Sequence, residues 1–182
     1  VLLGGLLLEL TLSVLNQKNI LKPWPKEVLG IFSQAQVKRA IEYSQANFKF
    51  GAISKVISTA IMIIMITEGG FDFVNSEVIK FSDNEAIQAL FFFGILMFAN
   101  QLISIPFSYY STFVIEEKFD FNNSTKKLFA IDTLKGLILG GLIGGGLLYL
   151  LGFLIEEIGA VFWLVFWAVM VLVMIFVNTF YT

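Results

Sequence analysis

The sequence predicts an all-α fold, a polytopic transmembrane helical bundle with about five spanning helices. Of its 182 residues, 57% are apolar and only 14% are charged, whereas a soluble domain has about 25% charged residues. Residues 86–115, 136–155 and 158–182 contain no charged side chain, and each run exceeds or matches the roughly 20 residues that a helix needs to cross a bilayer. We therefore expect the lipid bilayer, not water, to cover most of the surface.

The spans follow from the apolar runs in chain order. The first two are weaker, because one carries Glu9 and the other carries Lys55, whose side chain can extend to the lipid headgroups. Since the chain begins and stops inside apolar runs, we expect a fragment of a longer membrane protein. We expect a single membrane domain over residues 1–182, with spans near residues 1–15, 50–67, 86–115, 130–155 and 158–181.

A long connector, residues 16–49, joins the first two spans. Near its beginning Pro23 and Pro25 flank Trp24, and two prolines prevent a regular helix, whereas tryptophan suits the headgroup zone. Beyond residue 26 the apolar residues recur with helical spacing. An amphipathic helix at the cytoplasmic surface, continuous with the second span, and a solvated connector both fit this pattern.

Polar side chains form a stripe along the third span. Such a stripe avoids lipid, so it faces either neighbouring helices or water inside the protein. Within it, Pro106 removes a backbone hydrogen bond and is expected to bend the helix. The stripe consists of Gln101, Ser104, Ser108 and Ser111, which are spaced by three or four residues.

The fourth span contains glycines that recur every four residues, at Gly136, Gly140 and Gly144. Gly141 and Gly145 add a neighbouring ridge, so another helix can approach almost to backbone contact. Glycine also weakens a helix. Close packing and a flexible, gating helix therefore both fit the pattern.

The distribution of lysine and arginine predicts the orientation. The connector 16–49 and the connection between the third and fourth spans are rich in these residues, whereas the other two connections are acidic. Basic connections stay in the cytoplasm. We therefore expect a multi-pass integral membrane protein, in a bacterial inner membrane, with its N-terminal end outside and its C-terminal end in the cytoplasm.

Composition also limits the chemistry. The chain has no histidine and no cysteine, which removes the commonest general base, the commonest zinc ligand and all thiolate chemistry. We therefore expect no catalysis by histidine or cysteine and no metal site in this chain; the resemblance described below implies no catalytic residue in it either. A net charge of −2 gives no reason to expect nucleic acid as a partner.

The most informative stretch is the run P-F-S-Y-Y-S-T-F-V-I-E-E-K-F-D-F-N at residues 106–122. It reads as a helix that leaves the membrane into adjacent carboxylates, a cation and an Asx turn at Asn122. Glu116 and Glu117 point to different sides of a helix, so they are not a catalytic pair. Further along, Asp132 and Lys135 are spaced for an ion pair at the cytoplasmic end of the next helix.

This run closely resembles the signature ahead of the fourth helix in the type I CAAX prenyl proteases, which are integral-membrane zinc metalloendopeptidases. Residues 42–50 and 156–181 are similar to further parts of that family, so the resemblance covers nearly the whole chain. One position departs from the family pattern, because Asp120 stands where the family has glycine. Aspartate tolerates a left-handed backbone better than most residues, so we expect the turn to be kept.

The resemblance implies the N-terminal transmembrane part of a seven-helix metalloprotease that encloses a water-filled chamber. Zinc in that family is bound by H-E-x-x-H and a later glutamate, which this sequence lacks; we expect zinc only in the longer protein and no activity from this chain alone. The implied partners are the C-terminal catalytic part and a peptide or prenylated C-terminal substrate. The motif positions, expected to support the chamber or contact substrate, are Glu116, Glu117, Lys118, Asn122, Asp132 and Lys135.

Two other classes of protein are alternatives. A non-enzymatic five-helix protein, such as a transporter subunit or scaffold, would use the polar stripe and the glycine helix as a pathway. An intramembrane aspartyl protease needs two facing acids at membrane depth, and only Glu9 and Asp132 come near. An H-E-x-x-H motif encoded beyond residue 182 would favour the metalloprotease.

The charge distribution predicts that a cysteine placed at Lys38 faces the cytoplasm. An impermeant thiol reagent added to intact cells is expected to leave the Lys38→Cys variant unlabelled and to label it once the membrane is opened. A cysteine at Glu156, in an acidic connection, is the control and is expected to react in intact cells. The opposite pattern would reverse the topology.

Overall fold

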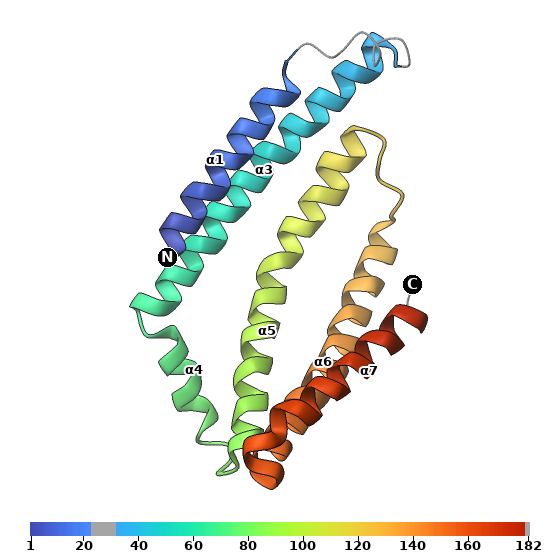
Figure 1. Cartoon of the computed structure of the whole chain (residues 1–182). Coiled ribbons are helices and arrows are strands. Elements are labelled where there is room, and N and C mark those ends of the chain that lie inside the picture. The colour runs from blue at the N-terminus through green and yellow to red at the C-terminus, as the bar shows by residue number, and fades with distance from the viewer. Residues whose placement is uncertain (23–31, 181–182) are drawn as a thin grey trace. The chain divides into compact units, whose positions relative to one another are not determined.

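The computed structural model describes residues 1–22 and 32–180, with side chains up to residue 179. Pro23, Trp24, Pro25 and the predicted helical pattern of residues 26–31 lie outside the described residues. All regular elements of the described part are helices, which confirms the all-α prediction (Figure 1). They are α1 (Leu2–Ile20), α3 (Gln34–Thr67), α4 (Gly70–Val78), α5 (Glu85–Tyr110), the π-helix η1 (Ser111–Glu116), α6 (Lys126–Ile158), the short 3-10 helix η2 (Gly159–Val161) and α7 (Phe162–Phe180).

Three stretches of the described chain are long and apolar enough to cross a membrane: Gln34–Thr67, Glu85–Glu116 and Lys126–Thr179. The last of these contains both α6 and α7. Their apolar side chains are largely exposed, as Trp163 and Trp167 show with exposed fractions of 57% and 66%. Lipid is the solvent that such side chains require.

The chain divides into two compact units. The first comprises Val1–Phe71 and Ile103–Phe129, and the second comprises Asp72–Leu102 and Ala130–Thr182. The boundaries pass through α4, α5 and α6, so each of these helices contributes residues to both units.

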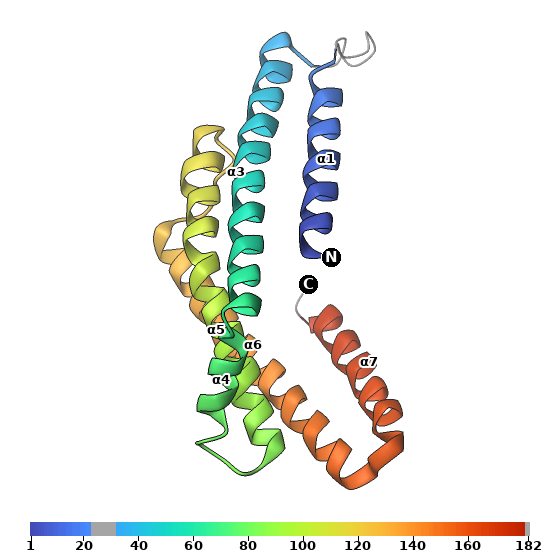
Figure 2. The ribbon, with the colours of Figure 1, turned by 90° about the vertical axis from the view of Figure 1, so that its left-hand side faces the viewer.

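In the first unit, α1 and α3 lie side by side and run in opposite directions (Figures 1 and 2). α3 begins with a capping box, in which Ser33 accepts a hydrogen bond from the Gln36 N–H and the Gln36 side chain accepts one from the Ser33 N–H. From there it runs unbroken to Thr67. The connector is therefore helical from residue 34 onward and continuous with the second predicted span; whether it lies at the membrane surface or in water stays a prediction.

Polar contacts join α1 to α3 along their length. The Lys55 Nζ lies 2.9 Å from the Glu9 Oε2, so Lys55 pairs with an acid of α1 instead of extending to the headgroups. Ser44 donates a hydrogen bond of 3.1 Å to Gln17, which is only 9% exposed. Glu9 and Lys55 neutralise each other's charge, so both side chains are tolerated among apolar neighbours.

In the second unit, α6 and α7 are joined by a reversal at Gly159. Its φ of 61° lies in the left-handed region that glycine adopts without strain. Beyond the reversal α7 diverges from α6 (Figure 2). The short helix α4, before α5, was not predicted.

The tightest helix approach in this unit occurs at Gly152, whereas among the glycines that the sequence singled out a Cβ at Gly145 or Gly144 would be in ordinary contact, 3.4 Å from the Leu90 side chain and 3.9 Å from the Met97 side chain. A Cβ added at Gly152 would lie 2.4 Å from the Cβ of Ala86 and 3.1 Å from its Cα. A Cβ added at Gly136, Gly140 or Gly141 would meet nothing within 4 Å in the described part of the chain. The predicted close approach is therefore displaced toward the end of α6, where Ala86 is buried.

Gly152→Ala is expected to destabilise the second unit by about 1–3 kcal/mol, because the new methyl group overlaps the Cβ of Ala86, which cannot move without its backbone. The matched control is Gly140→Ala, which meets no neighbour and is expected to leave stability unchanged or raise it by about 0.5–1 kcal/mol. Unfolding in detergent, followed by circular dichroism, measures both. Equal stability of the two variants would contradict the close approach at Gly152.

Candidate functional site

The predicted motif lies where α5 ends and α6 begins. α5 contains Pro106 and passes at Ser111 into the π-helix η1, which ends at Glu116. A π-helix has a wider turn than an α-helix, and such turns are frequent at functional sites. Residues 116–125, which begin at this last residue of η1, are called the motif turn below.

The motif turn ends the helix with a Schellman arrangement. The Phe121 N–H donates to the Glu116 carbonyl at 2.9 Å, and the Asp120 N–H donates to the Glu117 carbonyl at 3.2 Å. These bonds satisfy carbonyl groups that a helix end leaves without partners. They require a left-handed residue at position 120, and Asp120 has a φ of 56°, which confirms the expectation for this aspartate.

Asn122 connects the two sides of the turn. Its Nδ2 donates to the Glu117 Oε2 at 2.6 Å, and its Oδ1 accepts from the Ser124 N–H at 2.7 Å. The second bond is the predicted Asx turn. The Thr125 hydroxyl then accepts from the Leu128 N–H at 3.1 Å and caps α6. One short segment thus ends one helix and starts the next.

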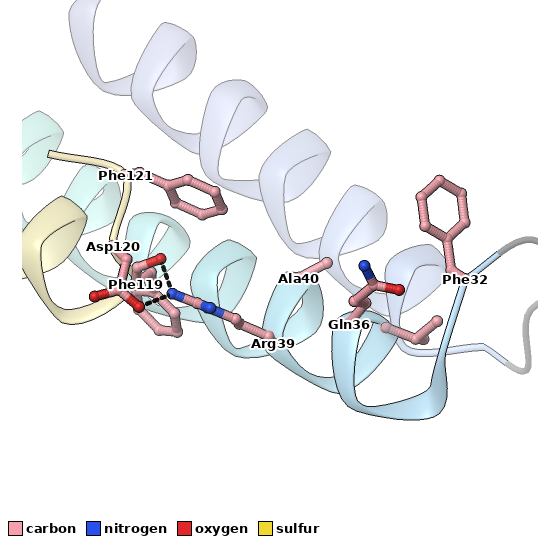
Figure 3. Close-up of a pocket in the computed structure, with 8 residues that line it drawn as sticks. Phe32, Gln36, Arg39, Ala40, Phe119, Asp120 and Phe121 are labelled. Atoms are coloured by element: carbon pink, nitrogen blue, oxygen red, sulfur yellow. Dashed lines mark hydrogen bonds and ion pairs between the residues drawn. The ribbon is translucent and has the colours of Figure 1, made fainter. Parts of the chain in front are cut away.

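Aromatic rings anchor the motif turn to α3. Phe119 is only 3% exposed, and the ring of Tyr43 packs edge-on against Phe119 and Phe121 with centroid distances of 5.4 and 4.8 Å. The Arg39 side chain donates to the Phe119 carbonyl and pairs with the Asp120 carboxylate (Figure 3). Its guanidinium also lies 5.8 Å from the centroid of the Phe121 ring, within the range of a cation–π contact.

Two cavities adjoin this turn. The Arg39 cavity has a volume of about 570 Å³, and the motif-turn cavity has a volume of about 490 Å³. Both volumes fall within the roughly 300–1,000 Å³ of small-ligand sites. The Arg39 cavity is lined by Phe32, Gln36, Val37, Arg39, Ala40, Phe119, Asp120 and Phe121, and the motif-turn cavity by Tyr109, Phe113, Val114, Glu117, Asn122, Ser124, Thr125 and Lys126.

The structure brings some of the predicted motif residues together and separates others. Glu117 and Asn122 are in contact, and the Lys118 Nζ lies 5.5 Å from the Phe119 ring centroid. Glu116 contributes its carbonyl to the turn.

The remaining two motif residues, Asp132 and Lys135, lie on α6 in the second unit. The described side chains of this pair form no ion pair within 4 Å, although their spacing allowed one. Sequence reasoning also missed that Arg39, Tyr43 and Asp120 contact the motif. Tyr43 belongs to the resembling segment 42–50, but nothing in its pattern indicated a contact with residues 119–121.

The predicted polar stripe is divided between the units. Ser104, Ser108 and Ser111 belong to the first unit and Gln101 to the second. Gln101 lines a groove of about 340 Å³ between α5 and α6, opposite Gly136 and other glycines of α6. Whether the serines face helices or water stays a prediction.

Within the described residues, no group of three or more His, Cys, Asp or Glu side chains is placed to hold a metal ion. The motif turn is therefore a hydrogen-bonding and ion-pairing site. Its donors and acceptors can hold a polar ligand group.

Comparison with known proteins assigns the family. A family model described as CAAX prenyl protease N-terminal, with five membrane helices, matches residues 14–182. The chain belongs to this family. The five membrane helices in the family description agree with the predicted number of spans, and the match confirms a multi-pass integral membrane protein. The assignment also favours a CAAX protease over the transporter subunit or scaffold.

Several relatives support the assignment. The probable CAAX prenyl protease 1 of Schizosaccharomyces pombe is 34% identical over 124 residues, which are 60% of this chain and 26% of that protein. The CAAX prenyl protease 1 homolog of Oryza sativa is 35% identical over 131 residues, 66% of this chain and 30% of that protein. The chain thus spans about a quarter to a third of these relatives.

The fold matches a solved structure of the same family. The crystal structure of S. mikatae Ste24p superposes with a TM-score of 0.87 at 28% identity, covering 98% of this chain and 44% of that one. The motif turn therefore lies in the membrane part of a protein that is longer in its relatives.

The hydrogen bond from Asn122 to Glu117 predicts that the turn tolerates exchanging the donor and the acceptor between these two positions. Asn122→Asp places two carboxylates where one amide donated, so we expect the Ser124 amide to exchange up to about fivefold faster, equivalent to about 1 kcal/mol at this exposed site. Adding Glu117→Gln restores a donor and is expected to return exchange to the wild-type rate. Hydrogen exchange followed by mass spectrometry measures this.

The matched control is Asn123→Ala, because Asn123 is exposed and its side chain makes none of the hydrogen bonds described for the turn. It is expected to exchange like the wild type. An Asn122→Asp variant that is not rescued by Glu117→Gln would show that the 2.6 Å contact does not hold the turn.

Proposed function

We propose that this chain forms part of the wall of a water-filled chamber in a membrane zinc metalloprotease that cleaves peptides or prenylated C-termini. The family match over residues 14–182 carries this proposal. The motif turn supports it, because the residues that resemble the family signature form one hydrogen-bonded unit beside a cavity. The whole enzyme's activity belongs to a longer protein of the kind represented by the relatives.

The motif turn is proposed to contact the substrate through the motif-turn cavity. Glu117 accepts hydrogen bonds, Asn122 can donate and accept them, and both line the cavity. Ser124, Thr125 and Lys126 lie at the N-terminal end of α6, where the helix dipole and a cation favour a carboxylate. Tyr109 and Phe113 supply apolar walls, and together these groups suit a peptide with apolar side chains and an ionised C-terminus.

The residues of this chain do not fit zinc. The sequence lacks histidine and cysteine, and the described acids form no metal-binding group. We therefore propose that the zinc ligands come from residues outside this sequence, and no bond-breaking role is assigned to this chain. When bound, zinc would supply an activated water molecule to such an enzyme.

We also propose that the motif turn faces the cytoplasm. The connector 16–49 and the segment around Lys118 are both rich in basic residues, and the orientation rule places each of them on the cytoplasmic side independently. The ion pair between Arg39 and Asp120 joins these two segments, as their shared side requires. The relatives compared are eukaryotic, so the proposal specifies an orientation and not a bacterial inner membrane.

The test compares two proteins. The parent protein, expressed with the sequence encoded beyond residue 182, is expected to bind zinc and to cleave a farnesylated C-a-a-X peptide. The 182-residue chain is expected to do neither, because its sequence has no histidine to bind zinc. Metal analysis and mass spectrometry of the peptide measure both properties.

A parent variant with the glutamate of H-E-x-x-H changed to glutamine is the control for contaminating proteases. A parent without that motif, or one that leaves the peptide intact, would refute the proposed function. One tightly held zinc per 182-residue chain would refute the assignment of the ligands.

A further inference from the structure

We propose that Arg39 is a positioning residue that holds the motif turn in place from α3. Arg39 itself lies outside the motif. Its final step, an effect on cleavage, rests on the proposed function.

Arg39 contacts three consecutive residues of the turn in three chemically different ways. It donates to the backbone carbonyl of Phe119, pairs with the carboxylate of Asp120 and lies over the ring of Phe121 (Figure 3). A single nitrogen, Nη2, makes both polar contacts. A surface ion pair alone contributes little, whereas this side chain restrains backbone, carboxylate and ring together.

Arg39 contacts the turn that ends the helix formed by α5 and η1, and a positive charge is stabilising at the C-terminal end of a helix. The last carbonyl groups of a helix carry partial negative charge, and arginine compensates that charge directly at the Phe119 carbonyl. At position 120 the left-handed backbone disfavours any residue but glycine. Aspartate accepts this strain, and its carboxylate becomes the partner of Arg39.

The three restrained residues lie between Glu117 and Asn122, two residues that line the motif-turn cavity. Asn122 follows Phe121 directly, and its amide must stay within 2.6 Å of the Glu117 carboxylate. The aromatic anchors, Phe119 and Phe121 on Tyr43, remain when Arg39 is removed. Loss of Arg39 is therefore expected to loosen the turn without unfolding the unit.

The neighbouring residue Lys38 provides a matched control. It has the same charge, but its side chain is 79% exposed and pairs with Glu42 at 3.9 Å on the same helix. Lys38→Ala removes one positive charge from this region without touching the turn. A general electrostatic effect would appear in both Lys38→Ala and Arg39→Ala, whereas a positioning effect appears only in the latter.

The first measurement reads the position of the turn directly. The chain has no cysteine, so spin labels can be attached at Ala35→Cys on α3 and Asn123→Cys in the turn, two exposed positions of the first unit. The distance distribution between the labels is measured by pulsed EPR in lipid nanodiscs. Arg39→Ala is expected to broaden it about twofold, on the scale of loop motion, and Lys38→Ala to leave it unchanged.

Two further variants separate charge from strain. Arg39→Lys is expected to keep a narrow distribution, because one nitrogen makes both contacts and an ammonium group can replace it. Asp120→Gly relieves the left-handed strain and keeps the Phe119 carbonyl contact, so it is expected to broaden the distribution less than Arg39→Ala. A distribution that Arg39→Ala leaves unchanged would overturn the proposal.

The second measurement uses the parent protein and a farnesylated peptide. Since the motif turn is proposed to bind substrate, Arg39→Ala is expected to raise KM about tenfold with kcat within about twofold, and Arg39→Lys to restore KM. An unchanged KM beside a broadened distance distribution would make Arg39 structural only and overturn its role in cleavage. If the wild-type parent cleaves nothing, the proposed function fails, while the spin-label result still decides whether Arg39 holds the turn.

Discussion

A helix that leaves a membrane must satisfy its last carbonyl groups, and the organisation of the first unit depends on how this is done after η1. The Schellman bonds of Asp120 and Phe121 satisfy two carbonyl groups, and Arg39 satisfies that of Phe119. Because Arg39 belongs to α3, the end of one membrane helix is defined by the beginning of another. The cavities beside the motif turn depend on that arrangement.

The same principle explains the polar residues of α1 and α3. A lone Glu9 or Lys55 would be costly among apolar side chains, but paired at 2.9 Å they neutralise each other. Gln17 and Ser44 add a hydrogen bond along the same pair of helices. The charged residues that weakened the predictions of spans at residues 1–15 and 50–67 therefore compensate each other once the two helices are paired.

Asp120 illustrates how a departure from a family pattern is accommodated. Glycine would adopt the left-handed conformation freely, and aspartate adopts it at φ 56°. In return the turn gains a carboxylate that pairs with Arg39. Aspartate at this position is compatible with membership of the family, because the Schellman turn requires a left-handed backbone and not a particular side chain.

The resemblance to the family predicted the left-handed residue at 120, and the sequence by itself determined the helical class, the number of spans and the Asx turn at Asn122. These features depend on composition, on local spacing and on the conformational limits of single residues. Tertiary structure alone decided that Arg39 and Tyr43 hold the turn, and that helices approach closely at Gly152 and not at Gly140. Contacts between residues distant in sequence depend on how helices are placed in space, and a helical repeat shows which residues share a face but not what that face meets.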